Sequence, residues 1–277
     1  MAALALLLVV TACGAPGDPA LVASTTRPTP DPTAGSAADT AEATPATTPV
    51  PTALPTPEPT AAPTPAAPFA MNLFRDGAFV QQYTFDWCVA ASVQMAWNMV
   101  MPQARTLRDD QQALWEMARD RSWNAHGGAN PFGWAAVLTE IGVGSYDVVS
   151  VDDYEQALRT AARAMRLTQR PVGLVMWSGR HAWVMSGFEA LGDPALGDDF
   201  TVTGIRVVDP LYPYGSAGWG PSPSPNSLLT PAQLATQFVV REPRRWSSGL
   251  GAGYLLVLPS TPLTAWRDVP ARGLPAA

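Results

Sequence analysis

The chain has 277 residues, of which 47% are hydrophobic, so it is long enough to bury a substantial core. Its formal net charge of −6 leaves no basic surface of the kind that nucleic acids bind. The two histidines and two cysteines are too few and too widely spaced for a zinc motif, and no phosphate-binding glycine pattern precedes a predicted helix. We therefore expect no metal, no other cofactor and no nucleic-acid partner.

The chain begins with an apolar stretch, Ala2 to Val10, that is shorter than the roughly 20 residues needed to span a bilayer. It runs into Thr11-Ala12-Cys13-Gly14, and small residues followed by a cysteine resemble a bacterial lipobox. In a lipobox the leader is removed and the cysteine is lipidated. We expect residues 1–13 to be a lipoprotein signal peptide and Cys13 to anchor the chain to a membrane. An ordinary secretory leader is the alternative, and it also places the folded part outside the cytoplasm.

Residues 14–68 are rich in Pro, Thr and Ala, with TPTPDPT as one clear stretch, and they contain no aromatic residue. Such a composition cannot bury enough apolar surface to offset the entropy of ordering, so it predicts a disordered, extended spacer. A folded domain is expected over residues 69–260. The proline-containing tail, 261–277, is expected to pack loosely or to be disordered.

Four segments have helical spacing of apolar residues or helix start signals. They begin at Cys88, at Leu107 in LRDDQQALWEMARDRS, at Asn130 in NPFGWAAVLTEIGV and at Asp152 in DDYEQALRTAARAMR. Asp86 is placed to cap the first of these helices, and the Asn130-Pro131 pair is typical of a helix start.

Later segments alternate or are continuously apolar, which indicates strands: PVGLVMWS, HAWVMSGFEA, FTVTGIRVVDP and GYLLVLP. An N-terminal helical half followed by an antiparallel sheet is an α+β arrangement. In such a fold, a group at the start of a helix in the first half can face groups on strands of the second half.

Several blocks resemble papain-like cysteine peptidases, and especially the branch that includes the bacteriocin-processing (double-glycine leader) peptidases. QQYTFDWCVAASVQMAWNM is similar to the nucleophile region of that branch, GRHAWVMSGFE to its histidine strand and IRVVDPLYP to its strand ending in Asp-Pro. LLTPAQLATQF followed by GYLLVLP is similar to the usual end of these domains. The resemblance implies a papain-like fold, with an N-terminal helical half packed on a C-terminal antiparallel sheet.

The resemblance also implies a role for four residues. Cys88, at a helix N-terminus that favours a thiolate, would be the nucleophile, and His181 would pair with it and protonate the leaving amine. Asp209 would orient the imidazole, and Gln82, six residues before Cys88, would stabilise the oxyanion together with the backbone N–H of Cys88.

Each of these residues has a simpler interpretation. Cys88 could be a small buried side chain, and Asp209 could begin the turn that Pro210 imposes. His126, in a glycine-rich loop, is the other histidine, and Gln81 is the alternative to Gln82. The sequence also has Val89 where glycine commonly follows the nucleophile in the family, which narrows the approach to the thiol.

These expectations combine into an extracytoplasmic, lipid-anchored, monomeric cysteine peptidase or amidase that acts on a peptide or protein substrate and is attached to the membrane through Cys13. If Cys13 is lipidated, Cys88 has no disulfide partner in the chain. Acyl transfer to an amine by a transglutaminase-like enzyme is one alternative. A non-catalytic surface binding module on a stalk is another.

Overall fold

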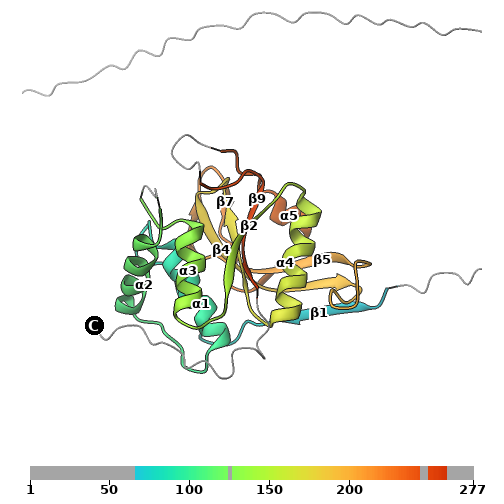
Figure 1. Ribbon diagram of the computed structural model, residues 1–277, viewed down its shortest axis with the longest axis horizontal. Coiled ribbons are helices and arrows are strands. Elements are labelled where there is room, and N and C mark those ends of the chain that lie inside the picture. Colours follow the sequence, from blue (N-terminus) through green and yellow to red (C-terminus); the bar gives the residue numbers. More distant parts are fainter. Residues whose placement is uncertain (1–65, 124–126, 244–248, 261–277) are drawn as a thin grey trace, which may run out of the picture. The chain divides into compact units, whose positions relative to one another are not determined.

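The computed structural model describes residues 66–123, 127–243 and 249–260 (Figure 1). All of them belong to one compact unit, Ala61–Ala277. The expected leader with Cys13, nearly all of the expected linker, the tail 261–277 and the alternative histidine His126 lie outside the described residues. Within the described ranges, no helix is both long and apolar enough to cross a membrane.

The four predicted helices are present, and a short fifth helix follows them. Their bounds are α1 Cys88–Val100, α2 Arg108–Asp120, α3 Pro131–Glu140, α4 Tyr154–Thr168 and α5 Pro231–Ala235. The helix start predicted at Asn130-Pro131 is confirmed: Pro131 is the first residue of α3, and the Asn130 side chain accepts a hydrogen bond from Gly133 N at 3.1 Å. The cap predicted for α1 is wrong: the N-cap residue is Trp87, and no side chain bonds the first turn.

Seven strands form one sheet, and every pair of neighbours in it is antiparallel. They are β1 Pro68–Asn72, β2 Tyr146–Val151, β3 Val172–Met176, β4 His181–Leu191, β5 Thr201–Val208, β8 Ser227–Leu229 and β9 Tyr254–Pro259. Their order is β2-β9-β3-β4-β5-β8, and β1 pairs with the far half of β4. The short strands β6 (Gly215–Ser216) and β7 (Gly220–Pro221) form a separate pair. The α+β class with an antiparallel sheet is confirmed.

The order of elements along the chain is less simple than helices first and strands later. β1 precedes all helices, and β2 lies between α3 and α4. Both are short edge strands with partly exposed side chains, so neither carries the apolar run that identifies the central strands. β1 begins at Pro68, one residue before the expected start of the domain.

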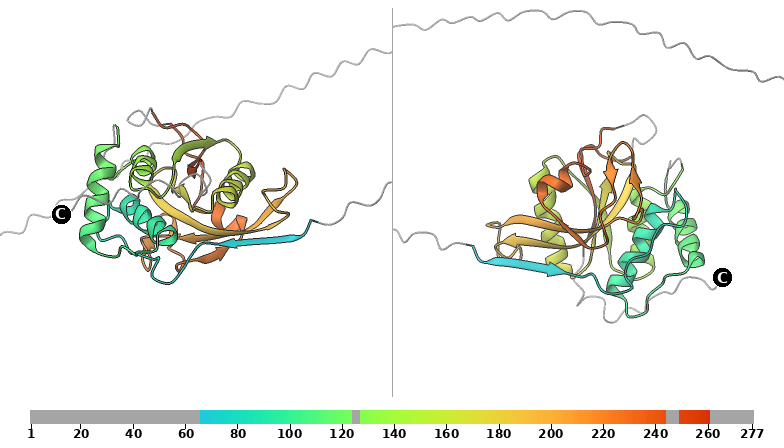
Figure 2. Two further views of the ribbon diagram at one scale, coloured as in Figure 1. Left: turned by 60° about the horizontal axis from the view of Figure 1, so that its bottom comes forward. Right: turned by 180° about the vertical axis from the view of Figure 1, so that it is seen from behind.

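Helices cover both faces of the sheet (Figure 2). Side chains of successive strand residues point to opposite faces. In β9, Leu255 and Val257 therefore pack in the cluster that contains α1, α2 and α3, whereas Leu256 and Leu258 pack in the cluster that contains α4 and α5. This two-sided burial is the reason the central strands are continuously apolar.

The contact between α1 and β4 positions the ends of both elements. The Ser92 hydroxyl on α1 donates to Ala182 O, the second residue of β4, at 3.3 Å. His181, the first residue of β4, pairs with Met176 at the end of β3. The N-terminus of α1, which is Cys88, therefore lies near the start of β4.

Candidate active site

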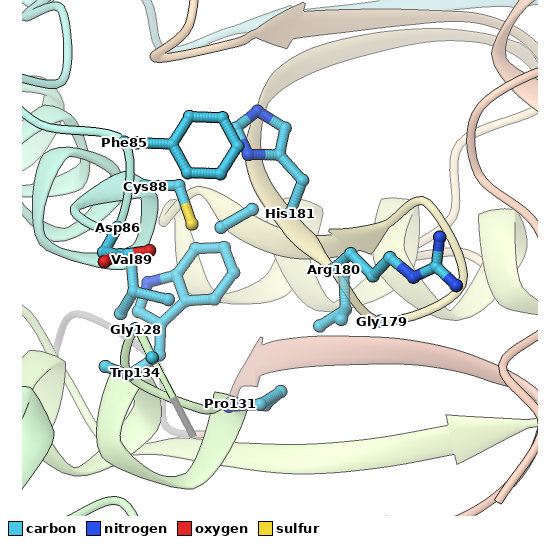
Figure 3. Close-up of a pocket in the computed structure, with 14 residues that line it drawn as sticks. Phe85, Asp86, Cys88, Val89, Gly128, Pro131, Trp134, Gly179, Arg180 and His181 are labelled. Carbon is cyan, nitrogen blue, oxygen red and sulfur yellow. The ribbon is translucent and has the colours of Figure 1, made fainter. Parts of the chain in front are cut away.

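Cys88 and His181 line the same open cleft, which has a volume of about 340 Å³ (Figure 3). The Cys88 thiol is free and half-buried, and it comes from the first residue of α1. The walls of the cleft come from the segment before α1, the start of α3 and the β3–β4 hairpin; they include Phe85, Asp86, Val89, Gly127 to Ala129, Pro131, Trp134, Val175, and Gly179 to Ala182. The structure thus brings together the predicted nucleophile and the predicted base, on a cleft that a substrate can enter.

His181 and Asp209 form a buried pair. His181 Nε2 lies 2.7 Å from Asp209 Oδ1, and both side chains are almost entirely inaccessible to solvent. Asp209 directly follows β5, whose last residue, Val208, pairs with Val184 on β4. The same Oδ1 accepts the backbone N–H of Leu211 at 2.8 Å, so Asp209 both orients the imidazole and closes the turn after β5.

The surroundings of His181 favour its charged form. Burial lowers the pKa of the imidazole, but hydrogen bonds with Asp209 and Cys88, together with the charges of these two groups, outweigh burial and raise the pKa of His181 from 6.5 to about 9. Because Nε2 is bonded to Asp209, Nδ1 is the ring nitrogen left for Cys88. The arrangement supports an imidazolium beside the sulfur near neutral pH.

Gln82 is held in the turn that leads to Cys88. Its backbone N–H donates to Pro210 O at 2.9 Å, which ties this turn to the segment after Asp209. Its side-chain Nε2 donates to Thr84 O and to Phe85 O, both at 3.0 Å. Both amide hydrogens are thus engaged, so the oxyanion role of Gln82 stays a prediction that requires one of these bonds to open.

The alternative glutamine has a different place. The main-chain oxygen of Gln81 accepts a hydrogen bond from Gln111 Nε2 on α2 at 3.2 Å. Gln111 also donates to Gln94 on α1 at 2.9 Å, within a buried polar group between the two helices. The backbone of Gln81 therefore joins the turn before Cys88 to the helical layer.

Trp177 contacts the site, although no sequence motif of the site includes it. Its ring is stacked on that of His181, with centroids 4.1 Å apart and planes 20° apart. Its indole N–H donates to Gln237 Oε1 at 2.9 Å, and its backbone N–H donates to Gln237 O at 3.0 Å. Trp177 adopts a left-handed backbone with φ of 57°, which is strained for a residue with a large side chain. Apolar periodicity gives no sign of such a contact, since a tryptophan at the end of a strand usually indicates core packing.

Val89 forms part of the cleft wall next to the sulfur, as Figure 3 shows. Its side chain is buried and belongs to the core cluster around α1. The side chain next to the nucleophile is therefore bulkier than the glycine that is common at this position in the family that the sequence resembles. Among the described residues, no group of three or more His, Cys, Asp or Glu side chains could hold a metal ion.

Comparisons with known proteins give little beyond this geometry. No protein-family model matches the sequence, and no curated protein is detectably similar to it. Among solved structures, UfSP from C. elegans matches with 18% sequence identity and a TM-score of 0.35. That match covers 63% of this chain and 30% of the UfSP chain, so this chain spans less than a third of the length of UfSP.

Proposed function

We propose that this chain is a cysteine hydrolase, a peptidase or amidase that cleaves a peptide-type bond through an acyl-thioester on Cys88. One observation carries the proposal: a free thiol and an imidazole face one open cleft, and the imidazole is bonded to a buried carboxylate at 2.7 Å. A nucleophile, a base next to it and an acid that orients the base are the elements of a catalytic triad.

In the acylation step, the Cys88 thiolate attacks the carbonyl carbon of the substrate. A C–S bond forms, and the electron pair of the C=O bond moves to the oxygen. The oxyanion can accept a hydrogen bond from the backbone N–H of Cys88, because the first N–H groups of a helix have no partner within the helix. The His181 imidazolium then gives its Nδ1 proton to the amine nitrogen as the C–N bond breaks.

In the deacylation step, the now neutral imidazole removes a proton from water, and the resulting hydroxide attacks the thioester carbonyl. The C–S bond breaks, the acid product leaves, and the thiolate beside the protonated His181 is restored. Asp209 accepts the Nε2 hydrogen throughout and holds the ring in one orientation. An amine in place of water would complete acyl transfer with the same residues.

The proposal includes the surroundings of the domain. A lipid on Cys13 would attach the chain to a bacterial membrane outside the cytoplasm, and residues 14–68 would separate the folded domain from the bilayer. The domain would act as a monomer on a peptide or protein substrate. Release of the protein from membranes by Cys13→Ala, followed by fractionation, tests the anchor separately from catalysis.

A peptide-library digest that compares the wild type with Cys88→Ala tests the reaction. Products identified by mass spectrometry should appear with the wild type and be absent with the variant, and a shared product pattern would overturn the proposal. Repeating the digest with an added primary amine distinguishes hydrolysis from acyl transfer. A control is Asp147→Asn, which changes an exposed side chain on β2 outside the cleft.

A further inference from the structure

Asp86 has a free carboxylate in the cleft. The sequence predicts that it caps α1, but the structure gives α1 no side-chain cap. Within the ranges that the structure describes, no residue donates a hydrogen bond to the Asp86 carboxylate or forms an ion pair with it. The side chain is exposed and lines the cleft two positions before Cys88. A carboxylate beside the nucleophile that no described side chain or main-chain donor engages is available to a ligand.

The wall opposite Asp86 consists of glycines. A Cβ atom added at Gly128 would lie 2.8 Å from the main-chain oxygen of Asp86, so only glycine allows this approach. Gly127 has a left-handed backbone with a φ of 79°, and a Cβ atom added there would lie 3.9 Å from Asp86 Oδ1. The wall is therefore close to Asp86, yet no side chain at either position covers the carboxylate.

Apolar side chains form the floor of the cleft between Asp86 and the sheet. Val89, Trp134 and Val175 are buried and line it. At the rim, the Phe85 ring is 85% exposed. A lysine or arginine side chain matches this arrangement, because its methylene stem can lie on an apolar surface while its charged end reaches a carboxylate. The exposed Phe85 ring at the rim adds a favourable contact for a cation that enters the cleft.

The other charged side chains that line the cleft do not neutralise the negative charge of Asp86. His181 is already bonded to Asp209, and it faces Cys88 in the cleft. Arg180 lies on the opposite wall, and in Figure 3 its guanidinium extends away from the sulfur, whereas Asp86 lies beside Cys88 and Val89. The unpaired charge next to the nucleophile is thus negative.

We propose that Asp86 makes the cleft selective for a lysine or arginine side chain next to the bond that Cys88 attacks. This inference rests on the proposed function for its substrate, but the subsite itself exists independently of catalysis. Asp86 is a specificity-determining residue in this assignment and takes no part in bond breaking.

Matched peptides test the selectivity. Substrates from the library digest are compared with versions in which one arginine near the cleaved bond is replaced by citrulline, which has nearly the same shape without the charge. The wild type should prefer arginine by about tenfold in kcat/KM, the range expected for one charged hydrogen bond. Asp86→Asn should reduce this preference to nearly one, and Asp86→Glu should keep most of it. Asp147→Asn, which removes an exposed carboxylate on β2 outside the cleft, is the control for net charge.

A second measurement does not need any cleavage. In the full chain with Cys13→Ser, Cys88 is the single thiol, and its modification rate is measured with a cationic and an anionic methanethiosulfonate reagent. The ratio of the cationic to the anionic rate should fall severalfold on Asp86→Asn and stay unchanged on Asp147→Asn. An unchanged ratio with Asp86→Asn, or a wild-type preference for citrulline or acidic peptides, overturns the inference. If no peptide is cleaved, the proposed function fails, while the reagent ratio still decides the role of Asp86.

Discussion

The two ends of β4 use polar groups in opposite ways. At its start, His181 is bonded to Asp209, and Asp209 Oδ2 and Gln82 Oε1 are buried without a partner among the described residues. At its far end, the loop between β4 and β5 is held by α4: Arg159 donates to Phe200 O and Asp198 O, and Arg166 pairs with both carboxylate oxygens of Asp193 at 2.9 Å.

This difference separates function from stability along one strand. Buried polar atoms without a hydrogen-bond partner lower the stability of a fold and are typical of sites that bind a ligand. Arginine donors that satisfy loop carbonyls hold a hairpin in place and leave nothing for a substrate. Substitutions at the start of β4 should therefore affect catalysis most, and substitutions at its far end should affect folding alone.

Apart from Cys88 and His181 themselves, the largest effect on activity is expected at Asp209. Asp209→Ala removes the acceptor that orients His181, so kcat/KM should fall by about 1,000-fold or more, as at other triads that lose the orienting acid. Steady-state kinetics on a peptide from the library digest measure the loss. A fall of less than about threefold would show that His181 is oriented by its packing and not by the carboxylate.

The same pair predicts how stability depends on pH. The folded-state pKa of His181 is raised from 6.5 to about 9, so the stabilisation is fully present below 6.5 and is lost as the pH rises through about 9. The free energy of unfolding, from urea titrations at several pH values, should decrease across this window. Asp209→Asn should flatten the decrease, because the neutral amide no longer stabilises the imidazolium. An identical slope in both proteins would contradict the assignment.

Gln82 is expected to have the next largest effect. If one of its amide hydrogens leaves Thr84 O or Phe85 O when substrate binds, Gln82→Ala should lower kcat by about 100-fold with little change in KM. Comparison with Gln81→Ala provides the matched control. Equal effects of the two substitutions would indicate that Gln82 acts only by holding the turn before Cys88.

Substitution of Trp177 should have moderate effects, and two variants separate its effect on stability from its effect on activity. Trp177→Phe keeps a ring over His181 but loses the indole bond to Gln237, so the free energy of unfolding should fall by about 1 kcal/mol while activity changes little. Trp177→Ala removes the ring and should also lower kcat by about tenfold. The pH profile of thiol alkylation, which reports the imidazole, should shift only in the alanine variant.

The smallest effect on activity is expected at the far end of β4. Arg159→Ala removes two bonds to loop carbonyls and a cation that lies 4.3 Å from the centroid of the Phe200 ring. The free energy of unfolding should fall by about 1 kcal/mol, with kcat/KM unchanged. Loss of activity in a folded Arg159→Ala protein would contradict the conclusion that the far end of β4 affects only folding.

Sequence reasoning reached the residues whose chemistry is distinctive. Cys88 and His181 could be selected because the chain has only two cysteines and two histidines. Acids are common in the chain, so Asp209 could be selected only through the resemblance of IRVVDPLYP to a strand that ends in Asp-Pro. Antiparallel pairing of β4 with β5 then brings His181 and Asp209 together without any further sequence signal.

What the sequence did not reveal depends on tertiary contacts. The helical period of α4 shows that one of its faces is buried, but it does not say that this face covers the side of the sheet opposite α1. The stacking of Trp177 on His181 was not predicted, and the cap predicted for Asp86 is wrong, for a similar reason. A left-handed backbone turns the first onto His181, and Trp87 takes the cap position that local spacing suggested for the second.

The sheet that carries His181 has a packed helical layer on each side, and this limits how the site can change. Any shift of the strand would disturb two hydrophobic interiors at once, so the histidine must stay nearly fixed when a ligand enters or leaves the cleft. New specificities should therefore arise by exchanging the short loops around the cleft, with the strands unchanged.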